Sequence, residues 1–196
     1  MRIHLLLLVA VCAVLSACNA ALSDHPMFVE AERSSKISVE DGLWYLVKEE
    51  CEITFTQPKE SWPKCADWVI FSRNKAVKSS DNKPDEQPQD LFIVDGKPPL
   101  IQAKVEANGS KQAYGFLALE AKSFSPSGRI TGAKVWMVPC GIDEAPEGAN
   151  PKIKPYPGFS EDCQPSSTEA LRAAASKGPA KTTDVVEWRW VRAEAP

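Results

Sequence analysis

The chain has 196 residues, and its 26 Asp and Glu side chains outnumber its 23 Lys and Arg side chains, giving a formal net charge of −3. Affinity for nucleic acid comes from clustered Lys and Arg, and the sequence contains no such cluster, so nucleic acid is excluded as a partner. The length fits a single domain that buries roughly two thirds of its unfolded surface.

An apolar segment opens the chain. It runs from Leu5 to Leu15 behind the single cation Arg2. About a dozen apolar residues are too few for a transmembrane helix, but they match the apolar core of a secretory signal peptide. We therefore expect residues 1–17 to be a signal peptide that is removed on export.

The end of this segment, Leu15-Ser16-Ala17-Cys18, resembles the lipobox of bacterial lipoproteins, an aliphatic residue and two small residues before a Cys. The resemblance implies cleavage before Cys18, a diacylglycerol on its sulfur and acylation of its new amine. Such chains anchor a protein to the membrane stably, because each buried methylene adds about 0.8 kcal/mol. Asn19 replaces the Asp that retains many such proteins in the inner membrane, so the resemblance implies the outer membrane, facing the periplasm. Ordinary secretory cleavage after Ala17 is the alternative, and it would leave Cys18 as an odd thiol.

The residues that follow this motif show no sustained hydrophobic periodicity. Residues 18–38 mix small, charged and Pro residues, so we expect lipidated Cys18 and a flexible tether ahead of a single domain over residues 39–196. A flexible chain of this length reaches about 25 Å. The apolar run Met27-Phe28-Val29 is open to another interpretation, in which it docks on the domain as a first strand.

The domain is predicted to be mostly β. Three early runs are apolar or alternate strictly, and a polar, Pro-containing surface loop over 79–89 follows them. Four later runs are separated by short turns, of which Asn108-Gly109 is the strongest hairpin signal because both residues tolerate positive φ. The predicted strands are Leu43–Lys48, Glu52–Thr56, Ala66–Phe71, Leu91–Val94, Pro99–Glu106, Tyr114–Lys122 and Arg129–Val138.

A long loop and a helix separate this meander from the last strand. The loop spans Cys140–Pro165 and is rich in Gly, Pro and acidic residues. Ser166 and Glu169 form a capping box for a helix that ends at Gly178-Pro179, and Asp184–Arg192 is the closing strand. The predicted fold class is therefore mainly β, a single antiparallel meander sheet or small barrel with one short C-terminal helix before the last strand.

Four cysteines remain in the domain once Cys12 leaves with the signal peptide and Cys18 takes the lipid: Cys51, Cys65, Cys140 and Cys163. An even number in an oxidising compartment predicts two disulfides. Three pairings are possible. The local one, Cys51–Cys65 with Cys140–Cys163, is the simplest and contributes about 3 kcal/mol per loop. Zinc is disfavoured by the absence of C-x-x-C spacing, so we expect no metal and no other cofactor.

Histidine is nearly absent from the exported chain. The sequence has only His4, in the signal peptide, and His25, in the segment next to the anchor. Ser–His and Cys–His nucleophiles need an imidazole close to the reacting group. We therefore expect a protein that is not an enzyme.

Three short motifs resemble those of serine β-lactamases and penicillin-binding proteins, which need no histidine. They are Ser61-Trp62-Pro63-Lys64, Ser80-Asp81-Asn82 and Lys181-Thr182-Thr183, the last one residue away from K-T-G. That family requires a long buried helix at the first motif, and Pro63 disfavours a helix there. The chain is also much shorter than that two-part fold, so we interpret these matches as chance.

Gly42-Leu43-Trp44 stands at the start of an early predicted strand, and a strand bearing Trp and Arg closes the chain. This arrangement resembles the lipocalins and wider calycins, in which the G-x-W tryptophan packs under an arginine of the final strand. Arg189 or Arg192 would be that arginine here. The resemblance implies a barrel that carries a small hydrophobic ligand. The alternative is that Trp44 is an ordinary core residue and the arginines face solvent.

Aromatic side chains supply the other candidate contacts. Trp62, Trp68 and Trp136 are candidates to line a ligand pocket, and Trp62 is expected to be the most exposed of them. Tyr156 and Phe159, in the long loop, are candidates for contact with a partner, or equally for a plug under the loop. We therefore expect a lipid-anchored periplasmic binding or structural module whose loops contact an envelope protein or polymer, with a calycin-like carrier of a small hydrophobic ligand as the alternative.

Overall fold

The structure is a computed structural model that describes residues 19–47, 51–80, 83–84, 88–107, 111–145 and 151–194. The expected signal peptide over residues 1–17, Cys18 and the turn predicted at Asn108-Gly109 lie outside the described residues. Within the described part of the chain, no helix has the length and apolar character needed to cross a membrane.

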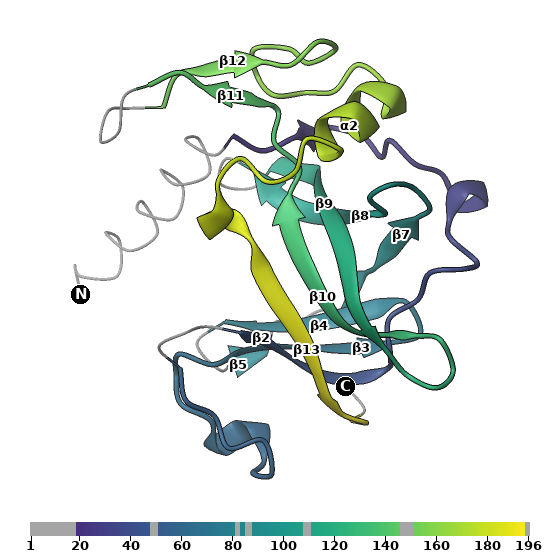
Figure 1. The fold of residues 1–196 in the computed structure, drawn as a ribbon, viewed down its shortest axis with the longest axis vertical. Coiled ribbons are helices and arrows are strands. Elements are labelled where there is room, and N and C mark those ends of the chain that lie inside the picture. Colours follow the sequence, from purple (N-terminus) through teal and green to yellow (C-terminus); the bar gives the residue numbers. More distant parts are fainter. Residues whose placement is uncertain are drawn as a thin grey trace.

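One antiparallel sheet forms most of the fold (Figure 1). Its strand order is β5-β4-β3-β2-β13-β10-β9-β8-β7, so the last strand, β13, lies between β2 and β10. Strand β6 pairs with β4 at one edge and is followed directly by β7 at the other edge. The two edges therefore meet, and the sheet nearly closes into a barrel. The bounds are β2 Gly42–Val47, β3 Asp67–Ser72, β4 Lys75–Ser80, β5 Lys83–Pro84, β6 Gln89–Asp90, β7 Phe92–Val94, β8 Leu100–Ala107, β9 Lys111–Phe124, β10 Ile130–Met137 and β13 Val186–Arg192.

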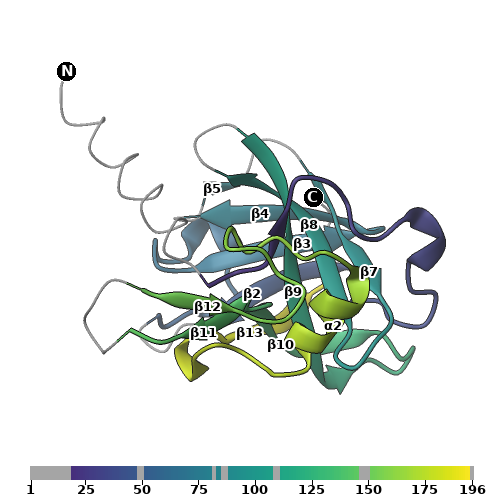
Figure 2. The ribbon, with the colours of Figure 1, turned by 90° about the horizontal axis from the view of Figure 1, so that it is seen from above.

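The predicted fold class is confirmed, because the protein is mainly β and helix α2 (Thr168–Ala175) precedes the last strand. A second, two-stranded sheet was not predicted. Its strands β11 (Gly141–Asp143) and β12 (Ile153–Pro155) lie inside the segment that was predicted to be a loop. Figures 1 and 2 show the β11–β12 hairpin and α2 at the same end of the barrel. Three short 3-10 turns complete the fold, η1 (Glu30–Glu32), η2 (Lys59–Ser61) and η3 (Thr182–Asp184).

Apolar side chains pack in three clusters, one inside the barrel and two outside it. Strand β9 shows the division: Leu117 and Leu119 belong to the interior cluster, whereas Phe116 and Ala118 belong to an outer cluster. This alternation is the two-residue period of a strand that is covered on both faces. Helix α2 and the N-terminal segment cover the outer face of β7–β10, and the loop before β3 covers the outer face of β2 and β3.

The prediction of a flexible tether over 18–38 is wrong for its described residues 19–38. Strand β1 (Leu22–Ser23) pairs with β9, and Phe28 is 2% exposed in the outer cluster under α2. The buried side chain of Gln102 accepts hydrogen bonds from the backbone N–H groups of Met27 and Phe28, at 2.8 and 3.0 Å, and donates to Phe28 O at 3.2 Å. Burial of Phe28 and these paired backbone groups hold the segment in place. Met27-Phe28-Val29 does dock on the domain, although not as a strand.

The predicted strand Glu52–Thr56 is also wrong. The segment is irregular, and the disulfide between Cys51 and Cys65 closes it into a loop with a Cα–Cα distance of 5.8 Å. Trp62 is the anchor of this loop and is only 4% exposed, contrary to its predicted exposure. Its ring meets those of Tyr45 and Phe55 edge to face, with centroids 6.2 and 6.0 Å apart. Aromatic packing on the outer face of β2 therefore decides the path of this segment.

The second disulfide joins Cys140 to Cys163, with a Cα–Cα distance of 5.2 Å, so both pairs follow the local arrangement. The helix that follows begins one residue later than predicted. Ser167, rather than Ser166, is its N-cap, because the Ser167 hydroxyl accepts a hydrogen bond from Ala170 N at 3.2 Å. The cap satisfies one of the backbone donors that the first turn of a helix leaves open.

Candidate ligand-binding site

Trp44 and the last-strand arginines do not form the contact that the calycin resemblance implies. Trp44 is fully buried in the barrel interior, where it meets Phe71 edge to face and donates its indole N–H to Glu40 O at 2.8 Å. Arg189 is exposed and bonds Glu187 at 2.9 Å. Among the described residues, no cation–π contact involves Trp44. Trp44 is therefore a core side chain.

The backbone conformation and the close packing at position 42 explain why the same motif has a glycine there. Its φ is +126°, and a Cβ built on it would lie 2.3 Å from the carbonyl oxygen of Arg192 in β13. Only glycine tolerates both this backbone conformation and this close approach. The guanidinium of Arg192 points elsewhere and donates to the carbonyl oxygens of Phe55 and Gln57. The glycine of the motif therefore allows β2 to pack closely against the last strand, β13.

The other predicted contact residues lie apart from one another. Trp62 is buried beneath the disulfide loop, as described above. Tyr156 and Phe159 are half-buried against the outer cluster under α2, and the Lys177 ammonium lies 5.0 Å from the centroid of the Tyr156 ring. The predicted set therefore does not converge on one site.

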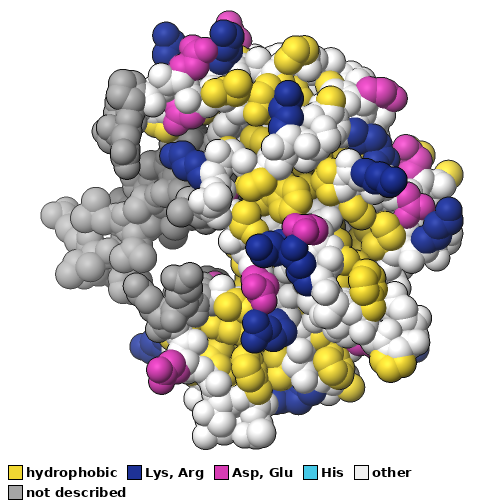
Figure 3. Space-filling view, in the orientation of Figure 1, with side chains coloured by type: hydrophobic (Ala, Val, Ile, Leu, Met, Phe, Trp, Pro, Cys, Tyr) yellow, Lys and Arg dark blue, Asp and Glu magenta, His cyan; other side chains and the backbone are white. Residues whose placement is uncertain are grey.

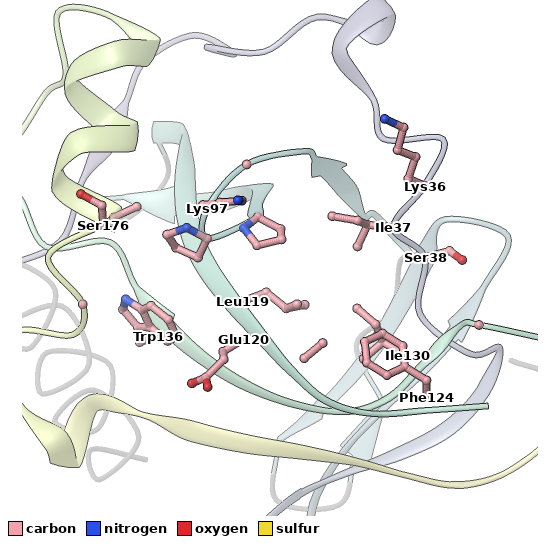
Figure 4. Close-up of a pocket in the computed structure, with 17 residues that line it drawn as sticks. Lys36, Ile37, Ser38, Lys97, Leu119, Glu120, Phe124, Ile130, Trp136 and Ser176 are labelled. Carbon is pink, nitrogen blue, oxygen red and sulfur yellow. The ribbon is translucent and has the colours of Figure 1, made fainter. Parts of the chain in front are cut away.

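A pocket of 590 Å³ lies at the side of the barrel, beyond the point where β8 begins (Figure 4). We call it the Trp136 pocket. Its apolar walls come from β9, β10 and the segment before β2, and its polar rim comes from the connections around it. The residues that line it are Lys36, Ile37, Ser38, Gly96, Lys97, Pro98, Pro99, Leu119, Glu120, Ala121, Phe124, Gly128, Ile130, Trp136, Ala175, Ser176 and Gly178.

Two consecutive prolines open this space. Strand β9 continues to Phe124, but its pairing with β8 ends where Ala118 faces Leu100. Leu119 N still donates to Pro99 O at 3.0 Å. Pro98 and Pro99 carry no backbone N–H, so they cannot extend the β8 ladder along the rest of β9. The last part of β9 therefore borders the pocket instead of another strand.

The opposite wall is fixed by hydrogen bonds to the start of β10. Ile130 N donates to Ser38 O at 2.9 Å, Glu40 N donates to Ile130 O at 2.8 Å, and Arg129 Nε donates to Val39 O at 3.0 Å. These bonds hold the segment that carries Ile37 across the end of the barrel. The pocket is thus bounded by ordered backbone on both sides.

Trp136 lines the pocket and carries a polar atom that is buried in apolar surroundings. Its side chain is 8% exposed, and among the described residues its buried indole nitrogen has no hydrogen-bond partner. Figure 4 places this nitrogen on the side of the ring nearest Ser176, at the end of α2. A buried N–H without an acceptor costs about 1–3 kcal/mol, so native structures rarely retain one without a reason. An acceptor atom on a bound molecule would remove this penalty.

The rim carries charge of both signs. Lys36 and Lys97 lie at the mouth, and Glu120 is held by Lys122 at 2.5 Å. The hydrogen bond from Lys122 lowers the pKa of the Glu120 carboxyl below its ordinary value, so this carboxylate stays ionised at neutral pH. Phe124, 61% exposed, extends the apolar wall out to the surface.

Trp136 was the one lining residue that the sequence indicated, as an aromatic in an apolar strand. The sequence did not indicate the apolar lining residues Ile37, Leu119, Ala121 and Phe124. None of them stands out from the apolar residues expected in a strand or a connecting segment. The one local sequence signal for the pocket was Pro98-Pro99. These prolines end the pairing of β8, whereas its partner β9 continues beyond that point.

His25 and Ser61, the described side chains considered above for catalysis, do not line the Trp136 pocket. His25 is exposed, and the Ser61 hydroxyl donates to Pro58 O at 2.7 Å in the short turn η2 rather than in an α-helix. Within the described ranges, no group of three or more His, Cys, Asp and Glu side chains lies close enough to hold a metal ion. Comparison with protein-family models, with curated proteins and with solved structures finds no match for this chain.

Proposed function

We propose that this protein is a lipid-anchored, non-enzymatic binding protein of the cell envelope, facing the periplasm from the outer membrane. Its ligand is a small apolar molecule with one hydrogen-bond acceptor, taken up in the Trp136 pocket. The proposal of a lipid anchor is supported by the motif that ends at Cys18 and by the apolar segment before it, which resembles a signal peptide. The observation that carries the ligand is the buried, unpartnered indole N–H of Trp136 at an apolar pocket.

The size and the lining of the pocket define the ligand class. A volume of 590 Å³ falls in the range of small-molecule sites, which are mostly apolar with a few placed polar groups. The ligand would direct a carbonyl, ester or ether oxygen to the Trp136 N–H and its apolar body along Leu119 and Ile130. Lys36 and Lys97 at the rim favour a neutral or anionic polar end over a cationic one.

The barrel interior is a poorer candidate for a ligand. A calycin-like carrier would hold its ligand there, but Trp44, Phe71, Val135 and their neighbours form a packed cluster in that space, and only its margin, at Leu119 and Ile130, borders the Trp136 pocket. The proposed ligand site therefore lies at the side of the barrel and not in the middle of its interior.

A protein partner is the second candidate, and Phe124 is the observation that favours it. Its ring is 61% exposed and lines the Trp136 pocket. Figure 3 shows apolar side chains gathered across the middle of one face of the molecule. A partner could place an apolar side chain in the pocket in place of a small molecule. Acidic and basic side chains are interspersed on the same face, which does not favour a polyanionic partner.

Native and denaturing mass spectrometry of the exported chain test the proposal. The chain is produced with Cys18→Ser, so that it is soluble and needs no detergent that could enter the pocket. We expect a small molecule that accompanies the native protein and is lost on denaturation. A Cys18→Ser chain that carries no molecule, together with a crosslink to an envelope protein from benzoylphenylalanine placed at position 124 of the anchored protein, would contradict the small-ligand proposal in favour of the second candidate.

Two variants locate the ligand. Ala121→Phe fills the pocket from β9 and should abolish the accompanying molecule. Trp136→Phe keeps an aromatic ring but removes the donor, and it should weaken binding about tenfold, because one hydrogen bond contributes about 1–1.5 kcal/mol. Val29→Ala, at an apolar side chain that is 61% exposed and does not line the pocket, is the control and should bind as the wild type does. Equal binding by all three variants would place the ligand elsewhere.

A further inference from the structure

The first described residue is fixed to the barrel. The Asn19 side-chain amide donates to Gly141 O at 2.6 Å, and its oxygen accepts from the backbone N–H groups of Cys140 and Gly141 at 3.0 and 2.9 Å. Ala20 and Ala21 are buried, and Ala21 N donates to Val138 O at 2.8 Å. The chain therefore becomes part of the folded domain at Asn19.

This attachment leaves no length for a tether. Consecutive Cα atoms are about 3.8 Å apart, so the Cα of Cys18 lies one such step from Asn19. A flexible segment over 19–38 would have let the domain stand about 25 Å away from its anchor. A lipid on Cys18 instead brings the part of the surface around Asn19 to the bilayer.

That part of the surface is apolar and grooved. A groove of 470 Å³ begins at Asn19 and runs between the β11–β12 hairpin and the connection from α2 to β13. We call its surroundings the anchor face, defined by Asn19, Met137, Ile142, Ile153, Pro179 and Lys181. Ile142 is 56% exposed and Met137 is 36% exposed, and both line the same groove as Asn19.

The charges near this face suit a lipid surface. Lys181 lines the groove, and Lys152 is exposed at the start of the segment that forms β12. Exposed apolar side chains flanked by lysines are the usual composition of a surface that rests at the headgroup level of a membrane. The two aspartates of the groove stay charged but are satisfied locally. Asp143 accepts from the backbone N–H groups of Lys152 and Ala145, which lower the pKa of its carboxyl, and Asp184 accepts from that of Lys181.

We infer that the anchor face lies directly on the phospholipid bilayer, with Ile142 and Met137 inserted at the headgroup level and the barrel standing on its β11–β12 end. The inference rests on the proposed lipidation of Cys18. The disulfide loop of Cys51–Cys65 then lies at the end away from the membrane, because Figure 1 shows it at the opposite end of the molecule from β11 and β12.

Photocrosslinking to lipid tests this orientation. The full lipidated protein, with benzoylphenylalanine in place of Ile142, is reconstituted in vesicles of phosphatidylethanolamine and phosphatidylglycerol and irradiated. We expect a phospholipid adduct, seen as a mass increment on the intact protein. The matched control carries benzoylphenylalanine in place of Phe55, which is also an exposed apolar residue, and should give at least tenfold less adduct.

A second variant tests whether the crosslink at position 142 depends on the short attachment to the anchor or only on the protein being close to a vesicle. Fifteen Gly and Ser residues inserted between Cys18 and Asn19 give the anchor a reach of roughly 20 Å, and the adduct at position 142 should fall several-fold. An acylated protein with no adduct at 142, or with equal adducts at 142 and 55, overturns the orientation alone. A mature chain whose mass shows no acylation overturns the proposed anchor and the orientation with it.

Discussion

Phe28 offers the sharpest stability test, because it lies in a segment that the sequence predicted to be a tether. Its side chain is 2% exposed, its ring meets Phe116 edge to face at 6.4 Å, and the Arg172 guanidinium lies 5.1 Å from its centroid. Truncation of a buried Phe to Ala usually costs 3–5 kcal/mol, so Phe28→Ala should lower the free energy of unfolding by about 4 kcal/mol. For a domain of this size, the melting temperature would fall by roughly 10 °C.

Urea denaturation followed by circular dichroism measures this change in the soluble Cys18→Ser form. The neighbouring Val29 is 61% exposed, so Val29→Ala is the matched control and should change the free energy of unfolding by less than about 0.5 kcal/mol. A loss below about 1 kcal/mol for Phe28→Ala, with an unchanged urea dependence, would show that residues 19–38 are not part of the cooperative domain.

Two further substitutions, each with a matched control, test separate parts of the account. Gly42→Ala meets Arg192 O and a positive φ, so it should destabilise the domain by about 2 kcal/mol or more in the same urea assay, whereas Gly128→Ala, with φ +81° and no atom within 4 Å, should cost about 1 kcal/mol. Equal losses would mean that β13 does not approach β2 as closely as described. Ser167→Ala removes the helix cap and should cost about 1 kcal/mol, and Ser166→Ala should cost much less, while the reverse order would restore the predicted cap.

Strands with a clear period were predictable, and segments held by distant partners were not. The alternation along β8 and β9 reports directly which side chains face the interior, and this was enough for the fold class. Residues 19–38 lack a period because only a few of them are buried, and what fixes them is Gln102, more than seventy residues away. Glu52–Thr56 has the alternation of a strand, but the Cys51–Cys65 disulfide and the Trp62 cluster determine its course.

The candidate site shows the same limit. The sequence indicated Trp136 as a candidate aromatic for a ligand pocket. What distinguishes it is a buried N–H with no acceptor among the described residues, and only the packing around it reveals this. Trp44 stood in a more suggestive motif, yet its N–H is satisfied by Glu40 O and its ring is core. A motif names a residue type at a spacing, whereas a ligand site depends on which polar groups the fold leaves unpaired.

The indole N–H resonances of the six tryptophans provide the most direct test of the proposed ligand site. The protein is labelled with ¹⁵N-tryptophan, and Trp136→Phe identifies the Trp136 signal. The probe is anilinonaphthalene sulfonate, an apolar anion with acceptor oxygens. Titration should move the Trp136 signal downfield in a saturable way, as its N–H gains an acceptor, and leave the Trp44 signal in place, since that N–H is already bonded. Ala121→Phe should abolish the shift. A Trp136 signal that does not move while the probe binds would contradict the proposed site.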